Sequence, residues 1–596
     1  MSDGAERSPS LIRYKVACPL FSSQRAYSSP EPRIAGMGHG VPPASPTSPN
    51  ATGVPGPFLL DVGLSSTVHI AGYFGFVDEP SQTEIAAFSV PVRDGIRPNE
   101  DRLGSNGNRC RTTRRHTCRP ERGKQMSEHV DVIIIGSGTA GLSALREVRK
   151  KTDDFLLIND GSWGTTCAAV GCMPSKALVE AANAFHRRLD FEAFGLSGAE
   201  AVVADIPAVL ARVRRLRDDF VKGPEKVRGN LGPRAIVGRA RLLGPDRVAV
   251  EGREIAARRI VLATGSRPVV PTNWARFGNR ILTTDTLFEQ RDLPRRIAVV
   301  GLGAIGIEMA QALSRLGLEV TGFDAVKALA GLTDPEVTGA LQTALEREFS
   351  LQLGAAVDLT EAEGGIAVSG MGGSFTADAI LAAMGRRANV DDLGLETLGV
   401  ELDDRGMPPV DPTTMQIVGL PVYLAGDANG DLALLHEAAD EGHIAGQNSA
   451  AEHPVHYCRR TQLTIVLSSP GVARVGARLV DLNPGSIAIG RADFARQGRA
   501  RIVKRNVGLM RLYADKETGW LKGAEMCVPA AEHIAHLLAL AIERGLTVHE
   551  MLAMPFYHPV LEEGLRSALR DLARQLPQRG ASDLSQCPAS GFEALD

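Results

Sequence analysis

The chain has few cysteines, little net charge and no long apolar run, and these absences argue against several classes of protein. Eight cysteines in 596 residues are too few for a disulfide-stapled secreted scaffold, so a reducing, cytoplasmic setting is expected. The net charge of −3 gives no reason to expect a nucleic-acid partner. No apolar run approaches the roughly 20 residues that cross a membrane. A hydrophobic content of 44% is ordinary for a globular protein, and this length predicts several domains.

The first 125 residues lack the periodicity of helices and strands. They hold 14 of the 35 prolines, and such a segment buries too little apolar surface to offset its ordering entropy. The segment ends in a basic run with three candidate metal ligands, Cys110, His116 and Cys118. A solvated linker is the main interpretation of this run, with a zinc or nucleic-acid role as the alternative. We predict that residues 1–125 are a disordered extension and that translation of the functional protein starts at Met126.

Two segments carry the pattern of a dinucleotide-binding fold. The first, residues 130–150, runs from a strand-like stretch through a GxGxxG turn into a helical stretch. Glycines there let the backbone approach a pyrophosphate that rests on the helix N-terminus. The glycines of this turn are Gly136, Gly138 and Gly141. After the next strand-like stretch the expected acidic ribose ligand is replaced by Asn159, followed by Asp160, and either side chain could serve.

The same pattern recurs in residues 296–316. The glycines of the second turn are Gly301, Gly303 and Gly306. The following strand-like stretch ends at Asp324. An acidic residue there accepts hydrogen bonds from a free ribose 2′-OH and repels a 2′-phosphate, so NAD is favoured over NADP. Two such units in one chain predict two bound nucleotides.

Residues 164–176, between the two units, contain Cys167 and Cys172. Cys172 lies just before the helix-forming run 175–185. A helix N-terminus lowers the pKa of a thiol and favours the thiolate, the reactive form in disulfide exchange. The alternatives are two structural cysteines or half of a zinc site, although the chain offers no second ligand pair at comparable spacing.

This stretch resembles the redox-disulfide motif of the flavin-dependent pyridine nucleotide–disulfide oxidoreductases, which include dihydrolipoamide dehydrogenase, glutathione reductase and mercuric reductase. Ser175-Lys176 is similar to the lipoamide and mercuric branches, whereas Thr165 and Ala169 depart from the usual Gly and Asn. The resemblance extends from about residue 130 to about residue 576 and includes three further segments, 263–268, 383–386 and 423–427.

The resemblance implies an α/β chain with two Rossmann-like dinucleotide-binding domains, one for FAD and one for NAD, followed by an α+β dimerisation domain. The expected boundaries are 126–273 and 405–452 for FAD, 274–404 for NAD, 453–576 for dimerisation and 577–596 for a tail. Within the dimerisation domain, the patterning predicts a strand at 501–507 and a long helix at 530–544.

The resemblance also implies which residues hold the cofactors. Those expected at FAD are Gly136, Gly138, Gly141, Asn159 or Asp160, Thr166, Lys176, Thr264, Gly265, Asp427, Leu434, Leu435 and His436. Those expected at NAD are Gly301, Gly303, Gly306, Asp324 and Gly385. Asp427 is expected to hold the ribityl chain, and the helix after Leu434 to direct its positive end at the flavin. No resident metal ion is implied.

Lys176 follows Cys172 by one helical turn, and the resemblance implies that it pairs with Glu308 beside the flavin. It also implies that Cys167 exchanges with substrate while Cys172 faces the flavin.

Residues 557–563 resemble the family's His-Pro-Thr-x-x-Glu motif. A dithiol substrate needs a group that takes its proton, and histidine suits this because its pKa lies near neutrality. Glu563 is placed to fix the tautomer of His558 and to support the imidazolium. The resemblance implies that His558 serves the partner subunit's disulfide, so the active site is complete only in a homodimer.

The expected activity is oxidation of protein-bound dihydrolipoyl groups by NAD⁺, with a lipoyl-bearing acyltransferase as partner. The first alternative is NAD(P)H-dependent reduction of another disulfide or of a metal ion. A non-catalytic subunit is a further alternative. Six retained residues argue against it: Cys167, Cys172, Lys176, Glu308, His558 and Glu563.

Overall fold

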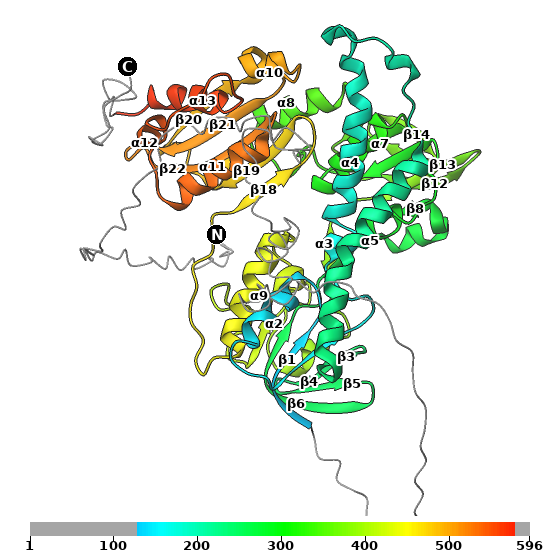
Figure 1. Ribbon diagram of the computed structural model, residues 1–596, viewed down its shortest axis with the longest axis vertical. Coiled ribbons are helices and arrows are strands. Elements are labelled where there is room, and N and C mark those ends of the chain that lie inside the picture. Colours follow the sequence, from blue (N-terminus) through cyan, green and yellow to red (C-terminus); the bar gives the residue numbers. More distant parts are fainter. Residues whose placement is uncertain (1–127, 578–596) are drawn as a thin grey trace, which may run out of the picture. The chain divides into compact units, whose positions relative to one another are not determined.

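A computed structural model describes residues 128–577, which belong to one compact unit of the chain (Figure 1). The predictions for Met126, for residues 1–125 with their candidate metal ligands, and for the tail beyond residue 577 lie outside the described residues. Within residues 128–577, no helix has both the length and the apolar character that a membrane crossing requires.

The first sheet has seven strands, of which five run parallel. The strands are β1 (Glu128–Ile135), β2 (Phe155–Asn159), β3 (Ala235–Val237), β4 (Arg241–Gly244), β5 (Arg247–Val250), β6 (Arg253–Leu262) and β17 (Val422–Leu424). Their order is β3-β2-β1-β6-β5-β4, and β17 pairs with the second half of β6. Val132, Ile133 and Ile134 of β1 are fully buried, as expected for a parallel strand covered on both faces.

Helices α2 (Thr139–Val148) and α9 (Leu435–Ser449) lie side by side against this sheet (Figure 1). Small residues allow their close approach, because a Cβ on Gly442 would lie 2.2 Å from the Ala140 carbonyl oxygen. The cysteine motif lies in α3 (Thr166–Ala169) and at the start of α4 (Cys172–His186), and the long α5 (Ile206–Leu231) follows. The sequence therefore brings a late segment, α9, against the first glycine turn.

The second sheet has five parallel strands in the order β11-β10-β9-β15-β8. Its strands and helices are β8 (Ile281–Leu282), α6 (Thr284–Leu287), β9 (Arg296–Val300), α7 (Ala304–Arg315), β10 (Glu319–Asp324), α8 (Pro335–Leu345), β11 (Ser350–Leu353) and β15 (Ala379–Ala382). A separate antiparallel sheet joins β12 (Asp358–Ala362), β13 (Gly365–Gly370) and β14 (Gly373–Ala377). A short ribbon of β7 (Ser266–Pro268) and β16 (Arg386–Ala388) pairs the two segments that connect the sheets.

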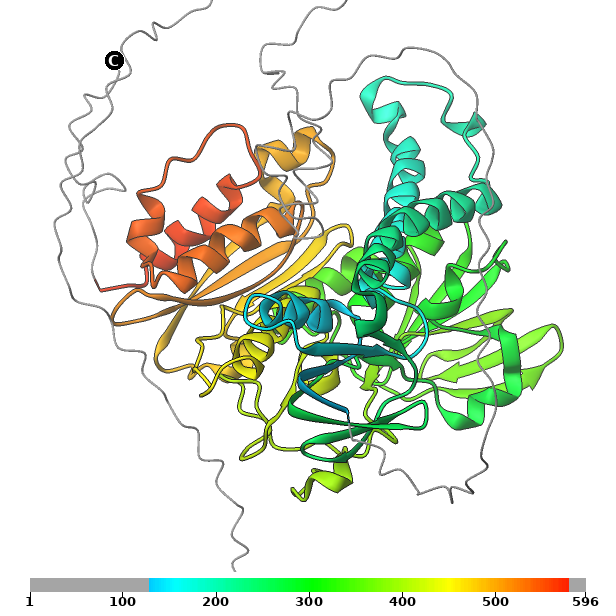
Figure 2. The ribbon, with the colours of Figure 1, turned by 60° about the horizontal axis from the view of Figure 1, so that its bottom comes forward.

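The C-terminal sheet is antiparallel, with the order β18-β19-β22-β21-β20. Its strands are β18 (Leu463–Val466), β19 (Gly471–Gly476), β20 (Ile487–Asp493), β21 (Leu509–Asp515) and β22 (Leu521–Val528). Four helices belong to this part: α10 (Gly498–Ile502), α11 (Ala531–Glu543), α12 (Val548–Leu552) and α13 (Glu563–Ala573). Helices α11 and α13 pack on the same face of the sheet, as the orange and red ribbons of Figure 2 show.

The predicted α/β fold class and the predicted helix at 530–544 are confirmed. The predicted strand at 501–507 is wrong, because helix α10 occupies its beginning and no strand follows before residue 509. The side chain of Gln497 caps α10 by accepting a hydrogen bond from the Ala500 N–H, and Ala500 is buried. This local cap decides the conformation where apolar patterning is weak.

A buried polar cluster holds α8 against the C-terminal sheet. Asp334 caps α8, accepts a hydrogen bond from the Tyr513 hydroxyl at 2.9 Å and forms an ion pair with Arg511, whose Nε lies 3.0 Å from the carboxylate. Glu525, which is fully buried, accepts from the backbone N–H groups of Thr333 and Asp334. Burial and the nearby carboxylates raise the pKa of Tyr513. The second sheet and the C-terminal sheet are thus joined by satisfied buried charges rather than by apolar packing alone.

Candidate active site

The two cysteines of the predicted redox motif lie at the start of neighbouring helices. Cys167 lies in α3, and Cys172 is the first residue of the 15-residue α4. Thr165, which stands where the family usually has Gly, caps α3 by accepting a hydrogen bond from the Ala168 N–H at 3.0 Å. Gly171 precedes α4 and offers no side-chain cap, so the positive end of α4 acts on Cys172.

The pKa values of the two thiols are shifted in opposite directions. The pKa of Cys172 is lowered to about 7, chiefly by a hydrogen bond from Cys167 and also by the Lys176 ammonium, against the opposing effect of burial. The same hydrogen bond and burial raise the pKa of Cys167. The pair is therefore polarised, with Cys172 as the thiolate and Cys167 as the proton-bearing thiol.

Lys176 and Glu308 are brought together from α4 and α7. The Lys176 Nζ lies 2.7 Å from the Glu308 Oε2, and Glu308 is only 3% exposed. The other carboxylate oxygen of Glu308 accepts a hydrogen bond from the Leu467 N–H at 2.8 Å. One buried carboxylate thus contacts both the cysteine-bearing helix and the segment between β18 and β19.

The first glycine turn forms a site that fits a dinucleotide. Helix α2 begins after Gly138 without a side-chain cap, and a Cβ at Gly138 would meet no atom within 4 Å. The open first turn leaves backbone N–H groups for a pyrophosphate. A cavity of about 560 Å³ adjoins this turn and is lined by Gly136, Asn159, Asp160 and Thr264, among others. The Thr264 Oγ1 is buried without a hydrogen-bond partner among the described residues, as expected of an atom that contacts a ligand.

Asn159 and Asp324 occupy equivalent positions in the two dinucleotide units. The Asn159 Oδ1 accepts a hydrogen bond from the Ser137 N–H at 3.0 Å. The Asp324 Oδ2 accepts one from the Leu302 N–H at 2.6 Å. Each donor is the second residue of its glycine turn, whereas Asp160 is exposed beyond the strand end. Asn159, and not Asp160, therefore occupies the position in the first unit that Asp324 occupies in the second.

The second glycine turn repeats the geometry of the first. Gly301 adopts a φ of +93°, and a Cβ there would lie 2.5 Å from the Ala383 carbonyl oxygen. Helix α7 begins after Gly303 without a side-chain cap, and a Cβ at Gly303 would meet no atom within 4 Å. Gly306 packs against Gly301, where a Cβ would lie 1.8 Å from the carbonyl oxygen. This turn also leaves room and free N–H groups for a pyrophosphate.

Asp427 lies in a polar cluster that the sequence alone did not single out. Its Oδ2 accepts a hydrogen bond from the Ser266 hydroxyl at 2.6 Å, and the Arg386 Nε donates to that hydroxyl at 2.7 Å. Ser266 and Arg386 come from the paired strands β7 and β16, which follow Gly265 and Gly385. Both lie inside the segments 263–268 and 383–386, which resemble the family. That resemblance was the sequence signal that could have identified Ser266 and Arg386 as site residues.

The N-terminus of α9 is also free of a side-chain cap. Leu434 is the N-cap residue, Leu435 begins the helix, and Leu435 is 45% exposed. The His436 side chain is half exposed, and its Nε2 lies 3.8 Å from a Glu437 carboxylate oxygen. The helix therefore presents backbone N–H groups to whatever binds at its start.

His558 and Glu563 form a dyad on the dimerisation part of the chain. The Nδ1 of His558 lies 2.9 Å from the Glu563 Oε1, and the hydrogen bond from His558 lowers the pKa of Glu563. The His558 side chain is 78% exposed. Among residues 128–577 of a single chain, its side-chain hydrogen bond is with Glu563, and neither cysteine is a partner. Glu563 thus orients the imidazole through Nδ1, and Nε2 is left to contact a substrate or another subunit.

The unequal acidities of the cysteines predict distinct spectra for two variants loaded with FAD. Cys167→Ser is expected to show a long-wavelength thiolate-to-flavin absorption that Cys172→Ser lacks. Because the Lys176 ammonium still favours the thiolate when Cys167 is replaced, this absorption is expected to be lost as the pH falls through the pKa of Cys172 in that variant. Adding Lys176→Met removes a cation that favours the thiolate, so the midpoint of a spectrophotometric titration moves to higher pH. The absorption in Cys172→Ser alone would show that the two roles are reversed.

Comparisons with known proteins agree with this geometry. Residues 130–442 match the family model of the pyridine nucleotide-disulphide oxidoreductases, and residues 463–569 match that family's dimerisation domain. The chain is 32% identical over 466 residues to the dihydrolipoyl dehydrogenase of Thermus scotoductus, covering 75% of this chain and 98% of that protein. It is 29% identical to the dihydrolipoyl dehydrogenase of Haloferax volcanii, covering 75% of this chain and 96% of the other.

Solved structures share the fold at lower identity. LpdA from Mycobacterium tuberculosis superimposes with a TM-score of 0.65 at 24% identity, over 74% of this chain and 99% of that one. The flavoprotein disulfide reductase RclA from Escherichia coli, as its Cu(II) complex, gives a TM-score of 0.65 at 22% identity, over 75% and 99%. From the family match and the relatives over 75% of its length, the chain belongs to the pyridine nucleotide-disulphide oxidoreductases, enzymes that use FAD and NAD(H).

Proposed function

We propose that the protein is a dihydrolipoyl dehydrogenase, which oxidises protein-bound dihydrolipoyl groups with NAD⁺. The observation that carries this proposal is the placement of the cysteine pair, with Cys172 at the uncapped start of α4 and Lys176, one turn later, paired with Glu308 at 2.7 Å. The two relatives with the same name and the Ser175-Lys176 sequence support the choice of a lipoyl substrate over other disulfides. A lipoyl-bearing acyltransferase is the proposed partner.

In this proposal residues 126–273 and 405–452 hold FAD, residues 274–404 hold NAD, and residues 453–576 form a homodimer. The uncapped starts of α2 and α7 receive the two pyrophosphates. Thr264, Asn159 and Asp427 contact FAD. Asp324 accepts the ribose hydroxyls of NAD and disfavours a 2′-phosphate.

The thiol chemistry starts from the Cys167–Cys172 disulfide. His558 of the partner subunit takes a proton from one substrate thiol, and the resulting thiolate attacks the Cys167 sulfur. A mixed disulfide forms, the Cys167–Cys172 bond breaks, and Cys172 leaves as the thiolate that its surroundings favour. The second substrate thiol then displaces Cys167, which regains its proton, and the substrate departs as a cyclic disulfide.

The two electrons taken from the substrate now belong to the cysteine pair. FAD, when bound, supplies the two-electron chemistry that connects this pair with NAD⁺. Lys176 and Glu308 form an ion pair next to the cysteine pair. Glu563 supports the imidazolium of His558. The chain's own contribution is therefore position, proton transfer and electrostatics.

An assay of the purified protein tests the substrate. Dihydrolipoamide with NAD⁺ is expected to give a kcat/KM at least about tenfold above that with NADP⁺, and Asp324→Ala is expected to narrow this difference. The matched measurement uses NADH and NADPH with oxidised glutathione and with metal ions. Faster turnover there than with dihydrolipoamide would replace the proposal by the alternative reductase activity.

Mixed dimers test whether His558 acts across the subunit interface. Cys167→Ser and His558→Ala are each expected to abolish most dithiol oxidation, His558→Ala by about two orders of magnitude or more. Random re-pairing of equal amounts makes about half of the dimers mixed, each with one complete site, so roughly a quarter of the unmutated activity returns. If subunit exchange is verified and no activity returns, His558 does not serve the partner's disulfide.

A further inference from the structure

One buried face of α7 carries three polar side chains in register. Glu308, Gln311 and Arg315 are spaced at three and seven residues, which places them on the same side of a helix. All three are buried, at 3%, 3% and 8% exposure. Buried polar groups on one helix face require partners. Glu308 and Gln311 contact the segment between β18 and β19, and Arg315 contacts Glu348.

Gln311 holds Ser469 at two points. The Gln311 Oε1 accepts a hydrogen bond from the Ser469 N–H at 2.8 Å. The Gln311 Nε2 donates to the Ser469 carbonyl oxygen, also at 2.8 Å. The side-chain amide of Gln311 thus bonds to both the N–H and the C=O of Ser469, as a paired strand would. The two bonds fix the position and the orientation of the Ser469 backbone.

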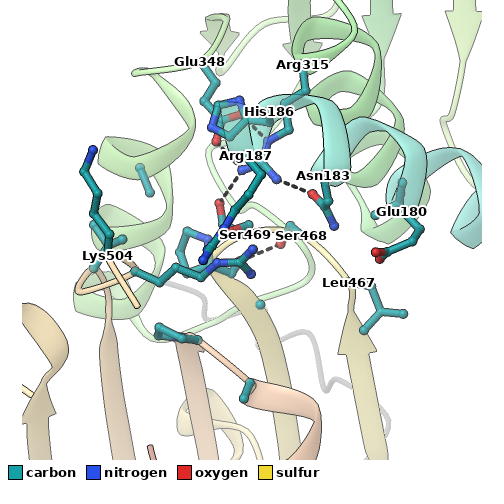
Figure 3. Close-up of a pocket in the computed structure, with 18 of the residues that line it drawn as sticks. Glu180, Asn183, His186, Arg187, Arg315, Glu348, Leu467, Ser468, Ser469 and Lys504 are labelled. Atoms are coloured by element: carbon teal, nitrogen blue, oxygen red, sulfur yellow. Dashed lines mark hydrogen bonds and ion pairs between the residues drawn. The ribbon is translucent and has the colours of Figure 1, made fainter. Parts of the chain in front are cut away.

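Arg315, one helical turn after Gln311, contacts Glu348 and the cysteine-bearing helix α4. Its Nε and Nη2 bind the two carboxylate oxygens of Glu348 at 2.6 and 2.7 Å, and its Nη1 binds the Asn183 side chain of α4. Figure 3 shows Arg315, Asn183, Glu348 and Ser469 around one pocket of about 560 Å³. Helix α7 is therefore tied to the cysteine-bearing helix at Asn183 and, through Glu308, at Lys176.

The backbone carries this constraint to the redox centre. Ser469 lies two residues after Leu467, and the Leu467 N–H donates to Glu308, which holds the Lys176 ammonium. Lys176 is 37% exposed, so without Glu308 it could turn toward water. We propose that Gln311 is a positioning residue of the redox centre: by fixing Ser469 it keeps Leu467 against Glu308 and Lys176 beside Cys172.

This inference rests on the proposed role of Cys172 as the thiolate that faces the flavin. A purely architectural Gln311 would stabilise the fold without changing the acidity of Cys172. A positioning Gln311 changes that acidity, because the ammonium that favours the thiolate moves away when its anchor loosens. Glu308 itself opposes the thiolate, but the effect of Lys176 on the pKa of Cys172 is the larger one. The two roles therefore differ in a measurable pH profile.

The experiment uses the FAD-loaded Cys167→Ser protein and the pH titration of its thiolate-to-flavin absorption. Adding Gln311→Leu removes both hydrogen bonds to Ser469, together with the one that the Gln311 Nε2 donates to Glu348 at 2.9 Å, while keeping a side chain of similar size. The midpoint is expected to move to higher pH, so that one pH unit below the original midpoint the absorption falls about threefold. The absorption at high pH, where Cys172 is fully ionised, is expected to be unchanged.

The matched control is Gln416→Leu, which removes a half-buried glutamine amide that donates to the Leu420 carbonyl oxygen at 2.7 Å in another part of the fold. It is expected to leave the midpoint unchanged. If Gln311→Leu does not fold, Gln311→Asn, whose shorter amide cannot span both contacts, gives the same test. An unshifted midpoint in a folded Gln311 variant overturns the proposal. Loss of the absorption in Cys167→Ser alone would instead contradict the role of Cys172.

Discussion

The carboxylate of Glu308 is the charge on which the rest of the site depends. Buried at 3% exposure, it needs partners, and it takes one from each side: the Lys176 ammonium from α4 and the Leu467 N–H from the C-terminal part of the chain. Removing one partner of a buried pair leaves an uncompensated charge, which costs several kcal/mol. Helix α7, the cysteine-bearing helix and the start of the dimerisation sheet are therefore held in one arrangement, which includes the Lys176 ammonium that helps to lower the pKa of Cys172.

Helix N-termini divide into two kinds in this chain. Asp205, Asp334 and Thr547 cap α5, α8 and α12 with their side chains, so the first turns of those helices are satisfied internally. The helices α2, α4, α7 and α9 have no such cap. These four begin at the two glycine turns, at Cys172 and at Leu434, where the proposed site needs free N–H groups for pyrophosphates, a thiolate and the flavin. The capped α3, which carries Cys167, and the uncapped α11 show that capping alone does not separate structural helices from those at the proposed site.

Local signals made much of this predictable. The β-strand, glycine turn and helix at residues 130–150 are encoded by adjacent residues, as is the helix that starts at Cys172. Contacts between distant segments were predictable only where the family resemblance implied them, as for Lys176 and Glu308. Nothing in the sequence around Gln311 or Arg315 indicates Ser469 or Glu348 as a partner. The same holds for Glu525 and Asp334, which meet across nearly 200 residues. The wrong strand at 501–507 has a different cause, since a single Gln497 cap outweighed weak patterning there.

In the proposed mechanism, the cysteine pair stores two electrons in series with the flavin. Anaerobic reductive titration of the FAD-loaded protein measures this directly, because a disulfide and a flavin each take up two electrons. The unmutated protein is predicted to accept about four electrons per FAD, and Cys172→Ser about two. Uptake of only two electrons by the unmutated protein, with both cysteines present, would contradict the account.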